Sequence, residues 1–112
     1  LPDLEALHVA CAFDLKVSEG RRGETAGLIS LVNEQMWVGH FDFWPTENVV
    51  MFRHALLLPG GAEPSAHQCE GMLAAAVEAC ERHYQAFQFV AWAGKSAREA
   101  LDAAMFETVG EA

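Results

Sequence analysis

Basic residues are scarce in this chain of 112 residues. Seven Lys and Arg stand against sixteen Asp and Glu, which gives a formal net charge of −9. Nucleic acids and anionic membrane surfaces attract proteins through clustered Lys and Arg, and the adjacent pair Arg21-Arg22 is too short to form such a cluster. The composition argues against both kinds of partner, and it is consistent with a basic partner or simply with a soluble surface.

The chain also has too few cysteines for a disulfide framework. Three cysteines cannot all pair internally. Cys69 and Cys80 fall on one predicted helix, about 16 Å apart at 1.5 Å per residue, which is too far for a disulfide. We interpret them, and Cys11 in a predicted strand, as small buried side chains in a protein of the reducing cytoplasm.

Long apolar runs and targeting signals are missing. No stretch reaches the length of a membrane span, and no signal-peptide pattern is present. With 52% apolar and 21% charged residues, the composition is that of a folded globular protein, and the length favours one domain over residues 1–112. The chain starts Leu-Pro-Asp without Met, so we expect the domain to be N-terminally incomplete.

The segment from Trp37 to Leu58 predicts a β-hairpin. Over 38–44 two sets of residues alternate, Val38, His40, Asp42 and Trp44 against Gly39, Phe41 and Phe43. Pro-Thr-Glu-Asn at 45–48 is a turn-type cluster, and a second apolar run follows. If Trp44 lies opposite Val49, one face carries Phe41 and Phe43. The other face then carries five larger or polar side chains: His40, Asp42, Trp44, Met51 and Arg53. This register brings Asp42 close to Arg53, and the apolar members of the face predict that something covers part of it.

The remaining periodicities predict one further strand and three helices. Alternation over 6–17 indicates a strand, and apolar spacing over 24–37 indicates a helix. Ser65 with Gln68, and Ser96 with Glu99, are capping boxes that begin helices running to about residue 92 and about residue 107. The apolar stripe of the longer helix has eight members: Cys69, Met72, Leu73, Ala76, Val77, Cys80, Tyr84 and Phe87. The pattern predicts an α+β domain in which an antiparallel sheet packs against helices.

No arrangement of residues points to catalysis, a cofactor or a metal. The chain has no Gly-x-Ser-x-Gly elbow and no phosphate-binding Gly-rich loop. His40 and Asp42 share a strand face as metal ligands often do, but the predicted register puts His54 on the opposite face. Cys80 and His83, spaced as a helical pair, are better explained by packing than by a catalytic dyad.

Four segments, in their order and spacing, resemble the YbjN family of bacterial sensory transduction regulators. They are 37–45 (W-V-G-H-F-D-F-W-P), 50–56 (V-M-F-R-H-A-L), the Pro59-Gly-Gly link and 79–92 (A-C-E-R-H-Y-Q-A-F-Q-F-V-A-W). The resemblance implies a fold similar to type III secretion chaperones, in the order helix, three strands, helix, two strands, helix, and commonly a dimer. On that template 6–17 is the third strand, 24–37 the middle helix, 38–57 the last two strands and 65 onward the C-terminal helical part. The first helix and first two strands are absent from this chain.

We therefore expect a non-enzymatic regulator or chaperone-like module of a bacterial cytoplasm that binds a partner protein and forms a homodimer. The expected contact face is His40, Asp42, Trp44, Met51 and Arg53. No catalytic, cofactor or metal residue is expected. One alternative is a small-ligand sensor or enzyme with a pocket between the long helix and the sheet, lined by His54, Tyr84 or Cys80. Another is a structural homodimer whose function lies in the missing N-terminal part.

Overall fold

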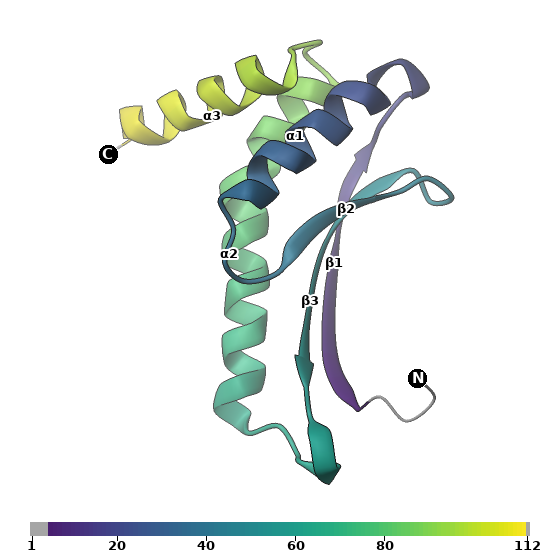
Figure 1. The fold of residues 1–112 in the computed structure, drawn as a ribbon. Coiled ribbons are helices and arrows are strands. Elements are labelled where there is room, and N and C mark those ends of the chain that lie inside the picture. The colour runs from purple at the N-terminus through teal and green to yellow at the C-terminus, as the bar shows by residue number, and fades with distance from the viewer. Residues whose placement is uncertain (1–4, 112) are drawn as a thin grey trace.

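Three strands and three helices make up the domain in a computed structural model, which describes residues 5–111 and side chains as far as Phe106. Two short 3-10 turns, Glu19–Arg21 and Pro59–Gly61, lie in the connections. The main elements are β1 (Ala6–Lys16), α1 (Arg22–Glu34), β2 (His40–Trp44), β3 (Val49–Leu57), α2 (Ala66–Ala91) and α3 (Ala97–Glu111). Figure 1 shows α2 running the length of the molecule beside the sheet, with α1 and α3 near its upper half. The α+β class is confirmed.

The sheet is antiparallel, with β3 between β1 and β2. The hairpin has the predicted register: Trp44 pairs with Val49, and Phe41 pairs with Phe52. Its turn ends at Asn48, whose φ of 58° lies in the left-handed region that asparagine tolerates better than most residues. The turn residues therefore fix which side chains share a face of the hairpin.

Helix α3 packs on α1 and α2, and these two helices cover one face of the sheet, which we call the inner face. Its alternating side chains from the three strands are Phe13, Leu15, Phe41, Val50 and Phe52, each no more than 6% exposed. The rings of Phe13 and Phe41 lie 5.6 Å and 5.4 Å from that of Phe87 on α2, separations typical of favourable aromatic pairs. Burial of these rings joins the sheet to α2 and stabilises the domain.

Helix α1 ends at Glu34, so the prediction that it reaches Trp37 is wrong. The side chain of Asn33 takes the hydrogen-bonding place of a neighbouring strand beside Phe41. Its amide N–H donates to the Phe41 carbonyl at 3.0 Å, and its amide oxygen accepts from the Phe41 N–H at 2.8 Å. The chain then turns through Gly39, whose φ is +74° and whose missing Cβ would lie 2.4 Å from the Phe52 ring. These contacts require the chain to leave the helix early, and they leave Trp37 fully exposed.

Helix α2 begins with the predicted capping box of Ser65 and Gln68. Its buried stripe is narrower than predicted, because Leu73 and Val77 are 59% and 53% exposed. The upper half of α2 has α1 and α3 beside it, whereas the lower half has only the sheet (Figure 1). The prediction therefore assigned two solvent-facing side chains to the core.

Helix α3 begins with the second predicted capping box and runs to Glu111, beyond the predicted end near residue 107. Ala100, Leu101 and Ala104 are buried as predicted, whereas Met105 is 54% exposed. A carboxylate oxygen of Glu24 on α1 accepts from the Ala97 N–H at 2.8 Å, which satisfies a backbone donor at the first turn of α3. This hydrogen bond joins the start of α3 to α1, although the two residues lie 73 positions apart in the chain.

Arg21 ties the end of α2 to the start of α1. Its Nε donates to the carbonyl of Val90 at 2.8 Å, and its Nη2 donates to the carbonyl of Lys95. A cation close to the last carbonyls of a helix also complements the negative end of the helix dipole. One member of the Arg21-Arg22 pair thus has a structural role within the domain.

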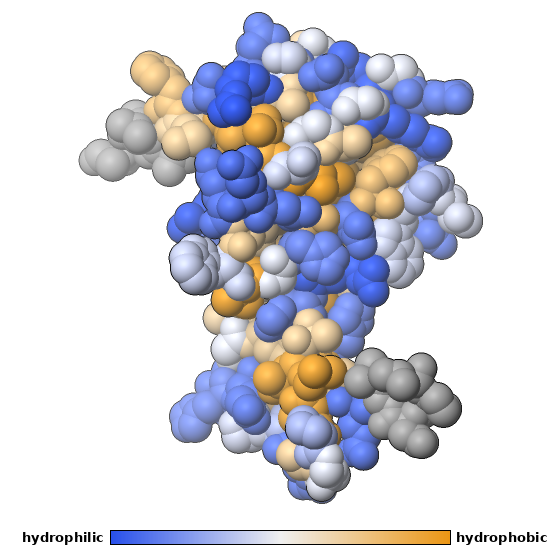
Figure 2. Space-filling model, viewed as in Figure 1, coloured by the Kyte–Doolittle hydropathy of each residue, from blue (hydrophilic) through white to orange (hydrophobic). Residues whose placement is uncertain are grey.

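Figure 2 shows polar residues over much of the visible surface, with hydrophobic residues in the upper middle of the view and again near the lower end, where β3 finishes. Leu57, at that end, is 62% exposed. Over the part of the chain that the structure describes, no helix has both the length and the hydropathy needed to cross a membrane.

Candidate functional site

The face of the sheet opposite the helices carries the five residues predicted as a contact surface. We call it the outer face. Strand pairing places these side chains there together: His40 lies opposite Arg53, Asp42 opposite Met51, and Trp44 opposite Val49. Trp44, Met51, Asp42 and Arg53 are half-buried, and His40 is exposed. The structure thus brings the predicted residues together on one surface.

Strand β1 completes the outer face with small side chains. Ala10 pairs with Arg53 and Ala12 pairs with Met51, and both alanines are exposed. The bulky side chains of β2 and β3 therefore stand beside a low strip along β1. Because the alanines of β1 project less far from the sheet than Arg53 and Met51, these larger side chains are accessible from the β1 side.

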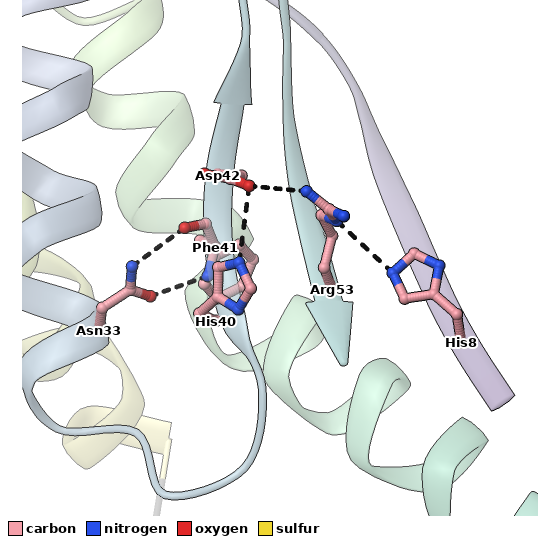
Figure 3. A network of polar contacts seen from close by, with 6 residues as sticks. All are labelled: His8, Asn33, His40, Phe41, Asp42 and Arg53. Atoms are coloured by element: carbon pink, nitrogen blue, oxygen red, sulfur yellow. Dashed lines mark hydrogen bonds and ion pairs between the residues drawn. The ribbon is translucent and has the colours of Figure 1, made fainter. Parts of the chain in front are cut away.

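Arg53 is the centre of a polar network on this face, drawn in Figure 3. Its Nη1 donates to Oδ2 of Asp42 at 3.1 Å, and its Nε approaches Nε2 of His8 at 3.5 Å. Nε2 of His40 lies 3.5 Å from the same Asp42 oxygen. The predicted proximity of Asp42 and Arg53 is confirmed. With 40% of the Asp42 side chain and 36% of the Arg53 side chain exposed, the pair stabilises the fold by only about 0–1 kcal/mol.

Arg53 also lies over an aromatic ring. Its guanidinium carbon is 5.4 Å from the centre of the Trp44 ring, within the range of a cation–π interaction. Val49 beneath this end of the hairpin is only 9% exposed although it belongs to the outer face. Trp44 and Arg53 are therefore held in place before any partner binds.

His8 is a member of the network that the sequence did not reveal. It reaches Arg53 because β1 pairs with β3, which sets His8 opposite Ala55. The alternation of residues 6–17 indicated which face His8 takes, but no local signal names the partner of an isolated strand. The pairing joins residues 45 positions apart in the chain.

A shallow depression of about 260 Å³ lies at the His8 end of the outer face. Its lining consists of His8, Gly39, His40, Arg53, His54 and Ala55. The predicted register is confirmed for His54: it pairs with Val9 and alternates along β3 with Arg53, so strand geometry directs its side chain to the inner face although it belongs to the lining of the depression. Among the residues that the structure describes, no group of three His, Cys, Asp or Glu could hold a metal ion.

The residues predicted to line a pocket between the long helix and the sheet instead belong largely to packing. Tyr84 meets the Phe13 ring edge-on, with 5.0 Å between the ring centres. Burial raises the pKa of the Cys80 thiol to about 12, and a hydrogen bond with Cys11 adds to the shift. A thiol held protonated is a poor nucleophile, so Cys80 is unsuited to the catalytic role considered for it.

A larger groove lies on the helical side, between α2, α3 and residues 35–38. Its volume is about 620 Å³, and small or apolar side chains form most of its lining. The fully exposed Trp37 stands at its rim. Burial, with a smaller contribution from Arg82, lowers the pKa of His83 in its wall. The ionisable lining residues of the groove, Glu78, Arg82 and His83, all come from α2, and Arg82 is paired with Glu78. The groove therefore offers shape and apolar surface more than chemistry.

Comparison with known proteins gives one match. The YbjN family, described as Putative bacterial sensory transduction regulator, matches residues 1–89. The matched region spans the whole sheet, α1 and most of α2, and it includes every residue of the outer face. No curated protein and no solved structure matches significantly. Because the match covers most of the chain, the chain belongs to the YbjN family.

Proposed function

We propose that this chain is a non-enzymatic regulatory module of a bacterial cytoplasm that binds a partner protein on the outer face of its sheet. One observation carries the proposal: Trp44, Met51 and Arg53 lie together on a face that no helix covers within the described residues 5–111. Tryptophan and arginine are the side chains that contribute most often and most strongly to protein interfaces. The family description as a sensory transduction regulator supports a role in regulation.

Preorganisation of the face supports the same proposal. The contacts of Arg53 with Asp42 at 3.1 Å and with the Trp44 ring at 5.4 Å restrict both long side chains. Ordering such a side chain on binding costs about 0.5–1.5 kcal/mol. A partner that docks on an already ordered pair avoids part of this cost, so binding there is favoured over binding to mobile surface side chains.

We also propose a homodimer on a chaperone-like fold. Strand β1 is an edge strand of eleven residues, and a long unpaired edge promotes pairing with another chain. The outer face offers a second surface for association. Light scattering at micromolar concentration should give twice the mass of the chain, and a monomer under these conditions would contradict the proposed dimer.

The experiment for the binding proposal compares two double variants. Trp44→Ser with Met51→Ser removes the apolar centre of the outer face, whereas Leu73→Ser with Val77→Ser removes two exposed apolar side chains from α2. Each variant serves as bait in affinity capture from the source cells, with mass spectrometry and with circular dichroism as the check on folding. We expect a reproducible partner that the α2 variant retains and the outer-face variant loses. Equal retention by both folded variants would show that the outer face is not the binding surface.

A second candidate function is the sensing of a small apolar ligand, which the groove of about 620 Å³ favours. This volume is within the range of small-molecule pockets, about 300–1,000 Å³. A thermal-shift screen of metabolites should then find a compound that raises the melting temperature. The larger side chain of an Ala75→Leu variant, in the groove lining, should abolish that rise. A rise that persists in this variant would place the ligand elsewhere.

A further inference from the structure

Two histidines of the outer face, His8 and His40, line the depression at the His8 end of this face together with Arg53. We propose that this depression is an anion-binding site that takes a single phosphate or carboxylate group. The inference rests on the proposed function and deepens it, because it names the chemical group that a partner offers to this end of the outer face.

The hydrogen-bond donors of Arg53 make the first step of the argument. A guanidinium has five N–H donors, and the contacts with Asp42 and His8 use two of them, which leaves three for a ligand. The planar arrangement of these donors matches the oxygens of carboxylate and phosphate groups. Asp42 already holds one side of the guanidinium in this way, so the group is presented in a geometry that suits an oxyanion.

The imidazoles add donors around the same depression. Nε2 of His8 accepts from Arg53, so the proton of a neutral His8 ring lies on Nδ1 and is available to a ligand. His40 lines the depression from the start of β2, and Arg53 lines it from β3. Three strands therefore supply donors to one place, which a run of charges along a single element would not do.

The charge and the size of the depression limit the kinds of ligand that it can bind. The chain carries sixteen acidic residues, yet the lining of the depression contains none, and Asp42 is the acidic neighbour that contacts it through Arg53 and His40. The local field at the depression thus favours an anion, against the net charge of the whole chain. A volume of about 260 Å³ is smaller than typical small-molecule pockets, so it suits one charged group rather than a whole cofactor.

The test is a titration of the purified protein with inorganic phosphate and, separately, with acetate at constant ionic strength, followed by NMR of the histidine ring signals. We expect saturable shifts of the His8 and His40 signals with at least one anion, while the signal of His67 on α2 stays unchanged. Saturation with phosphate alone assigns a phosphate group as the ligand, and equal saturation with acetate assigns a carboxylate. No saturable shift with either anion would overturn the proposal.

Two substitutions with opposite expected effects sharpen the test. Arg53→Gln should weaken binding at least about tenfold, because a charge-assisted hydrogen bond is lost. Asp42→Asn should strengthen binding severalfold, because it removes the carboxylate that competes for Arg53. Binding that survives Arg53→Gln in a folded variant would overturn the assignment of the site.

The Met51→Ser variant, which keeps Trp44 beneath Arg53, separates this inference from the proposed function. Its anion affinity should equal that of the unmodified chain, because Met51 does not line the depression and the ring next to Arg53 is that of Trp44. If the anion binds normally but this variant still captures the partner, the anion site stands and the proposed protein-binding face is wrong. If no anion binds but the variant loses the partner, the reverse holds.

Discussion

The two faces of the sheet differ in what holds their side chains. On the inner face, aromatic and aliphatic side chains are buried against α1 and α2, with Phe52 and Val50 fully inaccessible. On the outer face, side chains of similar size are half-exposed and organised by ion pairs and a cation–π contact. The inner face thus accounts for stability, while the outer face keeps large side chains ordered at little energetic benefit to the fold. Substitutions on either side of the same strand can measure this division.

The largest expected effect comes from the centre of the inner face. Phe52→Ala removes a fully buried ring that packs on Phe41 with 5.6 Å between ring centres. It should lower the free energy of unfolding by about 3–5 kcal/mol. Met51→Ala, the adjacent outer-face position, should lower it by less than about 1.5 kcal/mol because its side chain is already half-exposed. Urea denaturation measures both, and equal losses would contradict the division between the faces.

Gly39 tests how closely the backbone approaches the inner face. Gly39→Ala should lower the free energy of unfolding by about 2–4 kcal/mol, because φ is +74° and the new Cβ would lie 2.4 Å from the Phe52 ring. Gly60→Ala is the matched control, with a similar φ of +69° and no atom within 4 Å. It should cost about 1 kcal/mol from backbone strain alone. The difference between the two variants in urea denaturation isolates the clash, and no difference would mean that Phe52 moves away freely.

Sequence reasoning recovered the parts of the fold that local signals specify. The turn at 45–48 fixed the register of β2 with β3, and with it the proximity of Asp42 to Arg53. Both capping boxes marked where α2 and α3 begin. These features depend on residues a few positions apart, so the chain encodes them locally.

Contacts between residues far apart in the chain determine the features that the sequence did not predict. The pairing of β1 with β3 places His8 at Arg53, and nothing near His8 in the chain indicates it. Likewise, apolar periodicity identified a stripe on α2, but the exposure of Leu73 and Val77 depends on where α1 and α3 cross that helix. The anion-binding depression arises from three strands at once, which is why the alternation within one hairpin missed it.

A smaller effect on stability is expected from a change of pH, through His83 at the inner face of the sheet. Burial lowers the pKa of His83, whose ring packs edge-on against Phe41. The unfolded chain therefore binds this proton more readily than the folded one. The stability that neutral His83 maintains is fully present above about pH 6.5, and it is lost as the pH falls through the window between the unfolded and the lowered folded pKa. His83→Gln should flatten this loss of stability in urea denaturation measured across the window, and an unchanged pH profile would contradict it. His40→Gln, on the outer face, is the matched control.

The smallest expected change in stability is at the ion pair of the outer face. Asp42→Ala removes the partner of Arg53, yet both side chains are more than a third exposed, so water replaces the lost contact. The free energy of unfolding should change by no more than about 1 kcal/mol. The same substitution frees the guanidinium and should strengthen phosphate or acetate binding at the depression. A variant that loses stability by as much as Phe52→Ala would show that the network supports the fold. Unchanged stability together with tighter anion binding would show instead that Asp42 sets the affinity of the outer face.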